Sequence, residues 1–151
     1  MNTADDMHAL LVRVAGRVCA IPVAHVLETM RPLAIDSLTG LPSWISGVSV
    51  IRGAPTPVVS LSTLFGETAA PPGRFVVARA GVRRIALAVD TVLGVFNLAR
   101  DTVGPLPPLV QHAAGDAIGA LGSIDKELLL ILNSAKMMPD EVWEAAFPSK
   151  Q

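Results

Sequence analysis

Three histidines and one cysteine are the side chains of this chain best suited to bind a transition metal. His8, His25 and His112 are widely spaced, and Cys19 has no second cysteine or histidine at the short spacing that zinc sites show. A metal site is therefore not predicted. Because Cys19 falls in a segment that alternates like a half-buried strand, we expect a buried structural thiol in a reducing compartment.

The segment GVSVI at residues 47–51 comes nearest to a catalytic serine motif. Ser49 follows the Gly-x-Ser order of a nucleophile elbow, but Ile51 stands where a second glycine must relieve crowding. Ser49 is therefore interpreted as an ordinary strand residue. A hydrolase that uses Ser49 or Ser60 remains an alternative, and it requires a base about 3 Å from the hydroxyl.

Neither phosphate-binding glycine loops nor acid–base pairs are recognisable. The glycines match no dinucleotide fingerprint and no P-loop, so no cofactor is predicted. Glu28, Asp90 and Asp125 are far apart in the chain, and solvated charges are the simplest interpretation of them. We predict a protein that is not an enzyme.

The composition is that of one small domain with ample core material. Of 151 residues 51% are hydrophobic, and 12 basic residues balance 13 acidic ones. Nucleic acid is not an expected partner, because no basic excess, no tyrosine and only four phenylalanines are present. The acidic start and the absence of about 18 consecutive apolar residues predict a cytoplasmic chain without membrane insertion.

Apolar periodicity predicts a hairpin at the start of the chain. Strands at 9–14 and 18–21 flank an Ala-Gly turn. Residues 22–32 are predicted to form a short amphipathic helix, because Pro22 opens the segment, Pro32 closes it, and apolar residues recur at helical spacing. Those apolar residues are Val23, Val26, Leu27 and Met30.

Further elements are expected along the rest of the chain. The predicted strands lie at 47–51, 56–61, 75–79, 84–89, 118–124 and 128–132, with a helical turn at 62–65 and a last helix at 139–147. Residues 91–98 are compatible with a helix or a strand. Three prolines predict a loop at 104–109, and residues 68–73 (TAAPPG) are interpreted as a linker.

The second half of the chain repeats the first. Residues 20–27 correspond to 86–93 at a constant offset of 66, and five of the eight pairs are identical or Ile/Leu. Ile51, Val58 and Val59 correspond to later apolar residues at an offset of 73. This duplication predicts a mostly β protein built from two small barrels that share one core.

Residues 44–66, WISGVSVIRGAPTPVVSLSTLFG, resemble the signature segment of CheW-like domains. The pattern is a Gly-Val strand, a Leu/Ile-Arg-Gly turn and then Pro-Val/Ile-Val before a leucine. Further segments that resemble the family follow the same order from residue 9 to residue 138. The resemblance implies one domain at 8–138, with intertwined halves at roughly 8–67 and 74–138, followed by a C-terminal helix and tail at 139–151.

The resemblance implies two intertwined, five-stranded SH3-like barrels with short helices, and an adaptor function. A CheW-like protein binds the cytoplasmic tip of a chemoreceptor and the regulatory domain of a CheA-type histidine kinase, and other CheW-like domains are possible partners. Such a protein is cytoplasmic and joins membrane-anchored receptor arrays through its partners. The positions implied in protein binding are Arg52, Gly47, Gly53, Val26, Glu28, Val92 and Val95.

Simpler interpretations of these positions stay open, since Arg52 can be a solvated turn residue and the valines can belong to the core. Val50 and Ser60 depart from the family pattern, which has Asn and Asp there, so we expect a differently held turn and a divergent or accessory member. The rival from another class is an unrelated small-barrel module that binds ligands or peptides on an aromatic-lined face.

Overall fold

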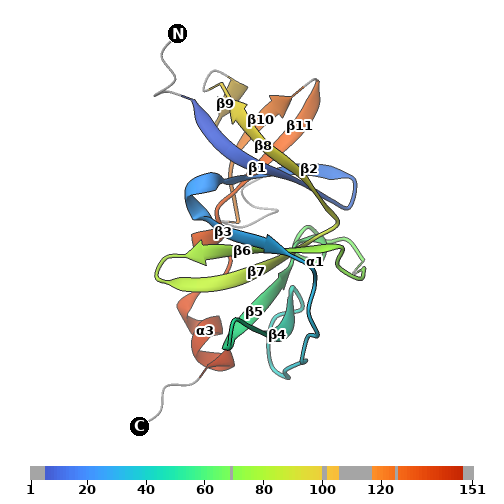
Figure 1. Cartoon of the computed structure of the whole chain (residues 1–151), viewed down its shortest axis with the longest axis vertical. Coiled ribbons are helices and arrows are strands. Elements are labelled where there is room, and N and C mark those ends of the chain that lie inside the picture. Colours follow the sequence, from blue (N-terminus) through green and yellow to red (C-terminus); the bar gives the residue numbers. More distant parts are fainter. Residues whose placement is uncertain (1–5, 69, 100–101, 106–116, 125, 148–151) are drawn as a thin grey trace.

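The computed structural model describes residues 6–68, 70–99, 102–105, 117–124 and 126–147, and within them the chain is mostly β (Figure 1). The strands are β1 (Met7–Val14), β2 (Arg17–Pro22), β3 (Val26–Met30), β4 (Ile45–Ile51), β5 (Ala54–Ser60), β6 (Arg74–Ala80), β7 (Arg83–Val89), β8 (Thr91–Leu98), β9 (Val103–Gly104), β10 (Ile118–Ile124) and β11 (Glu127–Leu132). Short helices are η2 (Val23–His25), α1 (Leu61–Leu64), η4 (Ser134–Lys136) and α3 (Asp140–Ala146).

The strands form two sheets that lie one above the other in Figure 1. One sheet has the order β8-β1-β2-β11-β10-β9, in which β9 contributes two residues, and the other has the order β3-β6-β7-β5-β4. Each sheet takes strands from both halves of the chain, because the hairpin β1–β2 joins β8 to β11 while β6–β7 joins β3 to β5. The expected mostly β, intertwined architecture is confirmed.

The pairing registers show the internal duplication directly. Ala20 pairs with Ile131 in the parallel ladder β2–β11, and Ala86 pairs with Val58 in the parallel ladder β7–β5. An offset of 66 takes Ala20 to Ala86, and an offset of 73 takes Val58 to Ile131, so the two ladders are equivalent. The antiparallel ladders β1–β2 and β6–β7 also coincide at the offset of 66.

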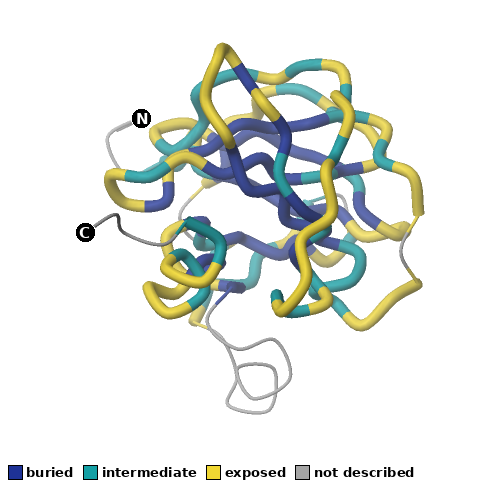
Figure 2. Tube along the Cα trace, turned by 90° about the horizontal axis from the view of Figure 1, so that it is seen from below, coloured by how far each residue is buried: buried dark blue, intermediate teal, exposed yellow. Residues whose placement is uncertain are grey.

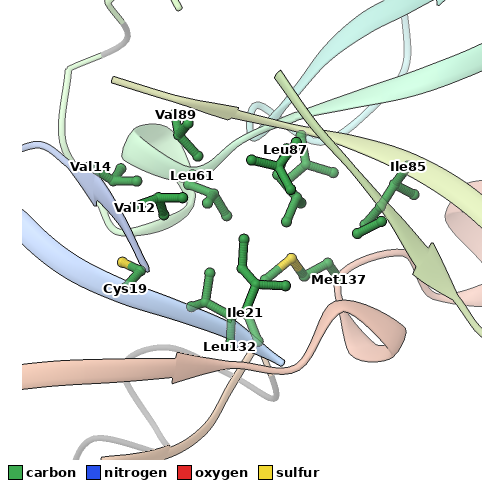
Figure 3. Packing of buried hydrophobic residues seen from close by; sticks show 14 of the residues in the cluster. Val12, Val14, Cys19, Ile21, Leu61, Ile85, Leu87, Val89, Leu132 and Met137 are labelled. Carbon is green, nitrogen blue, oxygen red and sulfur yellow. The ribbon is translucent and has the colours of Figure 1, made fainter. Parts of the chain in front are cut away.

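The largest core lies between the two sheets, and Figure 2 shows the buried residues in the interior of the molecule and the exposed residues along its outer segments. Equivalent positions of the two halves contribute to it: Cys19 and Ile21 of β2, and Ile85 and Leu87 of β7, all belong to this core (Figure 3). Cys19 is buried, which confirms the expected buried thiol, and this burial raises the pKa of the thiol to about 12. Each sheet also encloses a smaller core of its own.

The predicted helix at 22–32 is wrong. Only Val23–His25 is helical, as a single 3-10 turn, and Val26–Met30 is the strand β3, which pairs with β6. A bulge between Val26 and Glu28 places Leu27 on the same small core as Met30, and this spacing imitates a helix. Pairing with a neighbouring strand therefore overrides the local periodicity.

Other elements differ less from expectation. Residues 91–98 form the strand β8, the last helix spans Asp140–Ala146, and Ala54 and Pro55 belong to β5 rather than to the turn. Gly104 belongs to the short strand β9 instead of a loop. Pro105 has no regular secondary structure, and residues 106–109 of the predicted proline loop, His112 and Asp125 lie outside the described residues.

Candidate protein-binding site

Arg52 and Gly53 form the two-residue turn between β4 and β5. Both have positive φ, 51° for Arg52 and 79° for Gly53, as in a type I′ hairpin. Asparagine, aspartate or glycine is preferred at the first position, because other side chains crowd the backbone in the left-handed conformation. An arginine here is unfavourable for local folding, although Ala15 takes the same position with a φ of 50° in the Ala-Gly turn between β1 and β2.

The guanidinium of Arg52 is held by a carboxylate from a distant strand. Its Nε donates to Oε2 of Glu28 at 2.7 Å, and its Nη2 donates to Oε1 of Glu28 at 2.8 Å. Glu28 lies on β3 and Arg52 next to β4, which are the opposite edges of the five-stranded sheet. The bidentate pair therefore links the two edges and helps to close this sheet into a barrel.

Electrostatics keeps this pair ionised. The hydrogen bond from Arg52, and then the positive charges of Arg52 and Arg84, lower the pKa of the Glu28 carboxyl below its ordinary value of 4.5. The carboxylate in turn raises the pKa of Arg52. The side chain of Arg52 is still 72% exposed against 27% for Glu28, so the remaining N–H groups of the guanidinium face solvent.

Gly47 has a structural requirement of its own. It is buried, its φ is 148°, and a Cβ at this position would overlap the backbone carbonyl oxygen of Asp36. Asp36 and Val48 exchange two backbone hydrogen bonds of 2.8 and 2.9 Å, through which the preceding loop covers part of the edge of β4. A contact of Gly47 with a partner stays a prediction.

The three candidate valines occupy different environments. Val26 on β3 and Val92 on β8 are equivalent by the offset of 66, and both are half-buried against the main core. Val95 is 63% exposed on β8, and Leu93 and Phe96 of this edge strand are exposed as well. Packing therefore explains Val26 and Val92, whereas it does not explain Val95.

The structure brings Glu28, Arg52 and Gly53 together at one end of the five-stranded sheet, whereas Val92 and Val95 lie on the other sheet. Both Arg52 and Glu28 were candidates from the sequence, but the sequence did not predict their contact. The two residues are 24 positions apart on different strands, and no local pattern indicates which distant side chains meet. The sequence also missed Arg84, which acts on Glu28 and is the second residue of an Arg-Arg pair.

The candidate serines have structural roles. Ser49 is 1% exposed and donates a hydrogen bond to the carbonyl oxygen of Ala34 at 2.8 Å. Ser60 caps α1 by accepting a hydrogen bond from the backbone N–H of Thr63 at 3.4 Å. Ser60 thus supplies the local backbone contact that an aspartate would make, while Val50 exposes 60% of its surface.

Two intertwined sheets that share a core, with an exposed ion pair closing one of them, define a double-barrel protein of the SH3-like type. The family model of the CheW-like domain matches residues 8–142. The chain therefore belongs to the CheW-like domain family, which comprises chemotaxis scaffold and coupling proteins. Within the described residues, no helix is long and apolar enough to cross a membrane, and no group of three or more metal-ligating side chains occurs.

Curated relatives and a solved structure are similar over most of the chain. The chemotaxis protein CheW of Klebsiella aerogenes is 23% identical over 124 residues, which cover 80% of this chain and 75% of the relative. The protein FrzA of Myxococcus xanthus is 30% identical over 131 residues, covering 83% and 81%. The crystal structure of the scaffolding protein TtCheW from Thermoanaerobacter tengcongensis matches the fold with a TM-score of 0.79 and 19% identity, covering 90% of this chain and 94% of that chain.

Proposed function

We propose that this chain couples the cytoplasmic tip of a chemoreceptor to the regulatory domain of a CheA-type histidine kinase, without catalysing a reaction. Family membership supports the proposal, and the exposed Arg52–Glu28 pair is the observation that carries it. The protein would reside in the cytoplasm, joined to membrane-anchored arrays through its partners and to other CheW-like domains. Its binding surface comprises Arg52, Gly47, Gly53, Val26, Glu28, Val92 and Val95.

The carboxylate of the Arg52–Glu28 pair has no counterpart in the other half of the duplication. The offset of 66 takes Glu28 to Gly94, so the other barrel forms without a carboxylate at the equivalent position. The ion pair is therefore particular to the five-stranded sheet. Glu28 fixes the orientation of a guanidinium that is mostly exposed, and a fixed arginine fork binds a partner's carboxylate with less loss of side-chain entropy.

Replacing Arg52 by asparagine tests the proposal. Arg52→Asn removes the exposed ion pair but relieves the left-handed conformation, which asparagine tolerates, so the two effects offset and the melting temperature should change by no more than about 2 °C. The same variant should weaken assembly of receptor and kinase at least about tenfold, because a central arginine is a frequent hot spot. Co-sedimentation of the kinase with receptor-containing membranes measures the assembly, and thermal unfolding by circular dichroism measures the stability.

Arg17→Gln is the matched control, because Arg17 is an exposed arginine at the equivalent end of the other sheet and pairs with Glu67 at 3.4 Å. It should assemble like the wild type. Assembly that is unchanged by Arg52→Asn would refute the role of Arg52, and a wild-type chain that recruits neither partner would refute the coupling function itself.

A further inference from the structure

Two exposed arginines face each other across the β6–β7 hairpin. Arg79 and Arg84 are directly opposite in the antiparallel register, so their side chains lie on the same face of the sheet. Like charges at such a position destabilise a sheet. In the part of the chain that the structure describes, neither guanidinium forms an ion pair or a side-chain hydrogen bond. The hairpin therefore carries two arginines that no ion pair within the described residues neutralises.

The equivalent hairpin of the other half forms without this charge. The offset of 66 takes Arg84 to Val18, which is 2% exposed in a small core, and Arg79 to Arg13. Arg13 is neutralised by Glu127 at 3.1 Å. The second hairpin thus has one more arginine than the first. It also lacks the neutralising carboxylate, because the offset of 73 takes Glu127 of β11 to Ala54.

The two arginines lie beside the Arg52–Glu28 pair. Arg84 is close enough to Glu28 to help lower the pKa of that carboxyl. A surface hollow of about 150 Å³ adjoins them, lined by Leu27, Arg79, Gly81, Val82, Arg83 and Arg84. One carboxylate thus lies among several guanidinium groups, which leaves an excess of positive charge around the hollow.

Arg83 is occupied elsewhere and anchors the hairpin. Its Nη1 donates to Oδ1 of Asp140 at 2.9 Å, and its guanidinium lies over the ring of Trp143 at 4.7 Å from the centroid. These contacts hold the hairpin against α3. The backbone that carries Arg79 and Arg84 is therefore fixed, and both guanidinium groups are exposed to a ligand.

Apolar groups beside the arginines distinguish a protein segment from a small anion. Val82 at the tip of the hairpin is fully exposed, and Leu27 lines the hollow from β3. A free phosphate would leave these apolar surfaces in water, whereas a peptide can cover them. We infer that the hollow binds an acidic protein segment in which two carboxylates, one for each arginine, flank an apolar side chain. This inference rests on the proposed coupling function and assigns the segment to one of its partners.

Peptide binding by the full-length chain tests the inference. The probes are a fluorescein-labelled Glu-Glu-Leu-Leu-Glu-Glu peptide and its Gln-Gln-Leu-Leu-Gln-Gln counterpart, followed by fluorescence anisotropy. The wild type should bind the acidic peptide at least about tenfold more tightly than the neutral one, and added salt should weaken binding. Arg79→Gln combined with Arg84→Gln should remove this preference, whereas Arg17→Gln should keep it.

Arg84→Val adds a readout that a purely structural role would not produce. Valine is the residue at the equivalent position of the other hairpin, and it removes the repulsion with Arg79, so the melting temperature should rise by about 2 °C or more while acidic-peptide binding falls. Equal affinity for the two peptides, undiminished binding by the double variant, a lower melting temperature of Arg84→Val, or displacement of the peptide by inorganic phosphate at low millimolar concentration would each overturn the inference.

The outcome is separable from that of the proposed function. Full assembly of receptor and kinase by the Arg79→Gln, Arg84→Gln variant, together with unchanged peptide binding, would refute the acidic-segment site and leave the coupling function intact. Absence of assembly by the wild-type chain would instead refute the coupling function.

Discussion

Arg52 combines an unfavourable backbone conformation with a side chain that is oriented by one carboxylate. Its φ of 51° favours asparagine or glycine, and its two hydrogen bonds to Glu28 hold the guanidinium in a single plane. The turn would form more readily with another residue. A binding role for the exposed face of the guanidinium, as proposed above, would account for an arginine at this position.

The Arg52–Glu28 pair should give stability a defined pH dependence. The folded-state pKa of Glu28 is lowered, so its contribution is complete above the ordinary pKa of 4.5 and is lost as the pH falls through the folded value. Wild type should therefore melt at a higher temperature than Glu28→Gln at neutral pH, and the difference should disappear as the pH falls through the lowered folded-state pKa of Glu28. Thermal unfolding from pH 7 to pH 3 measures this difference. A difference that stays constant on acidification would contradict the assigned pair.

At the scale of elements, α3 is a short helix that closes one side of the main core. Val142, Trp143 and Ala146 pack against that core, while Arg83 of β7 contacts both Asp140 and Trp143. Figure 1 shows α3 beside the five-stranded sheet and separate from the other one. Because both sheets are complete before residue 139, the helix contributes packing without contributing a strand.

Truncation after residue 138 should lower the melting temperature by several degrees while the protein stays folded, because the loss is confined to one apolar helix face and the Arg83 contacts. Circular dichroism of the truncated chain measures both effects. Asp140→Asn serves as a milder variant, since it removes one exposed ion pair and should change the melting temperature little. A truncated chain without a cooperative transition would show that the domain extends beyond residue 138.

At the scale of the whole molecule, the exchange of hairpins between the two halves decides stability. Each sheet has its central hairpin from one half and its outer strands from the other. The main core is likewise formed by equivalent residues of both halves, such as Ile21 and Leu87 (Figure 3). Neither half can complete a sheet by itself.

We therefore expect residues 1–68 and residues 74–151 to be unfolded as separate peptides and to regain β structure when they are mixed. Each fragment alone exposes unpaired strand edges and half of the shared core. Far-UV circular dichroism of each fragment and of the equimolar mixture checks this. A cooperative thermal transition in either fragment alone would disprove the mutual dependence.

Local patterns in the sequence were sufficient for the hairpins and for the duplication. Alternating apolar residues identify β1–β2 and β6–β7, and the constant offsets of 66 and 73 reappear as equivalent registers in the two sheets. The position of Arg52 in a tight turn followed from the Arg-Gly dipeptide between two apolar strands. These features depend on neighbours within a few positions of the chain, which the sequence displays directly.

Only the tertiary structure decided which distant residues meet. It made Val26–Met30 a strand because β6 supplies backbone partners, and it paired Arg52 with Glu28 because the five-stranded sheet curls until its edges approach. It also decided that Val92 is half-buried while Val95 on the same strand is exposed. The periodicity of one segment indicates which of its faces is apolar. Which residues cover that face depends on strand order and sheet curvature, and these are set by contacts across the whole chain.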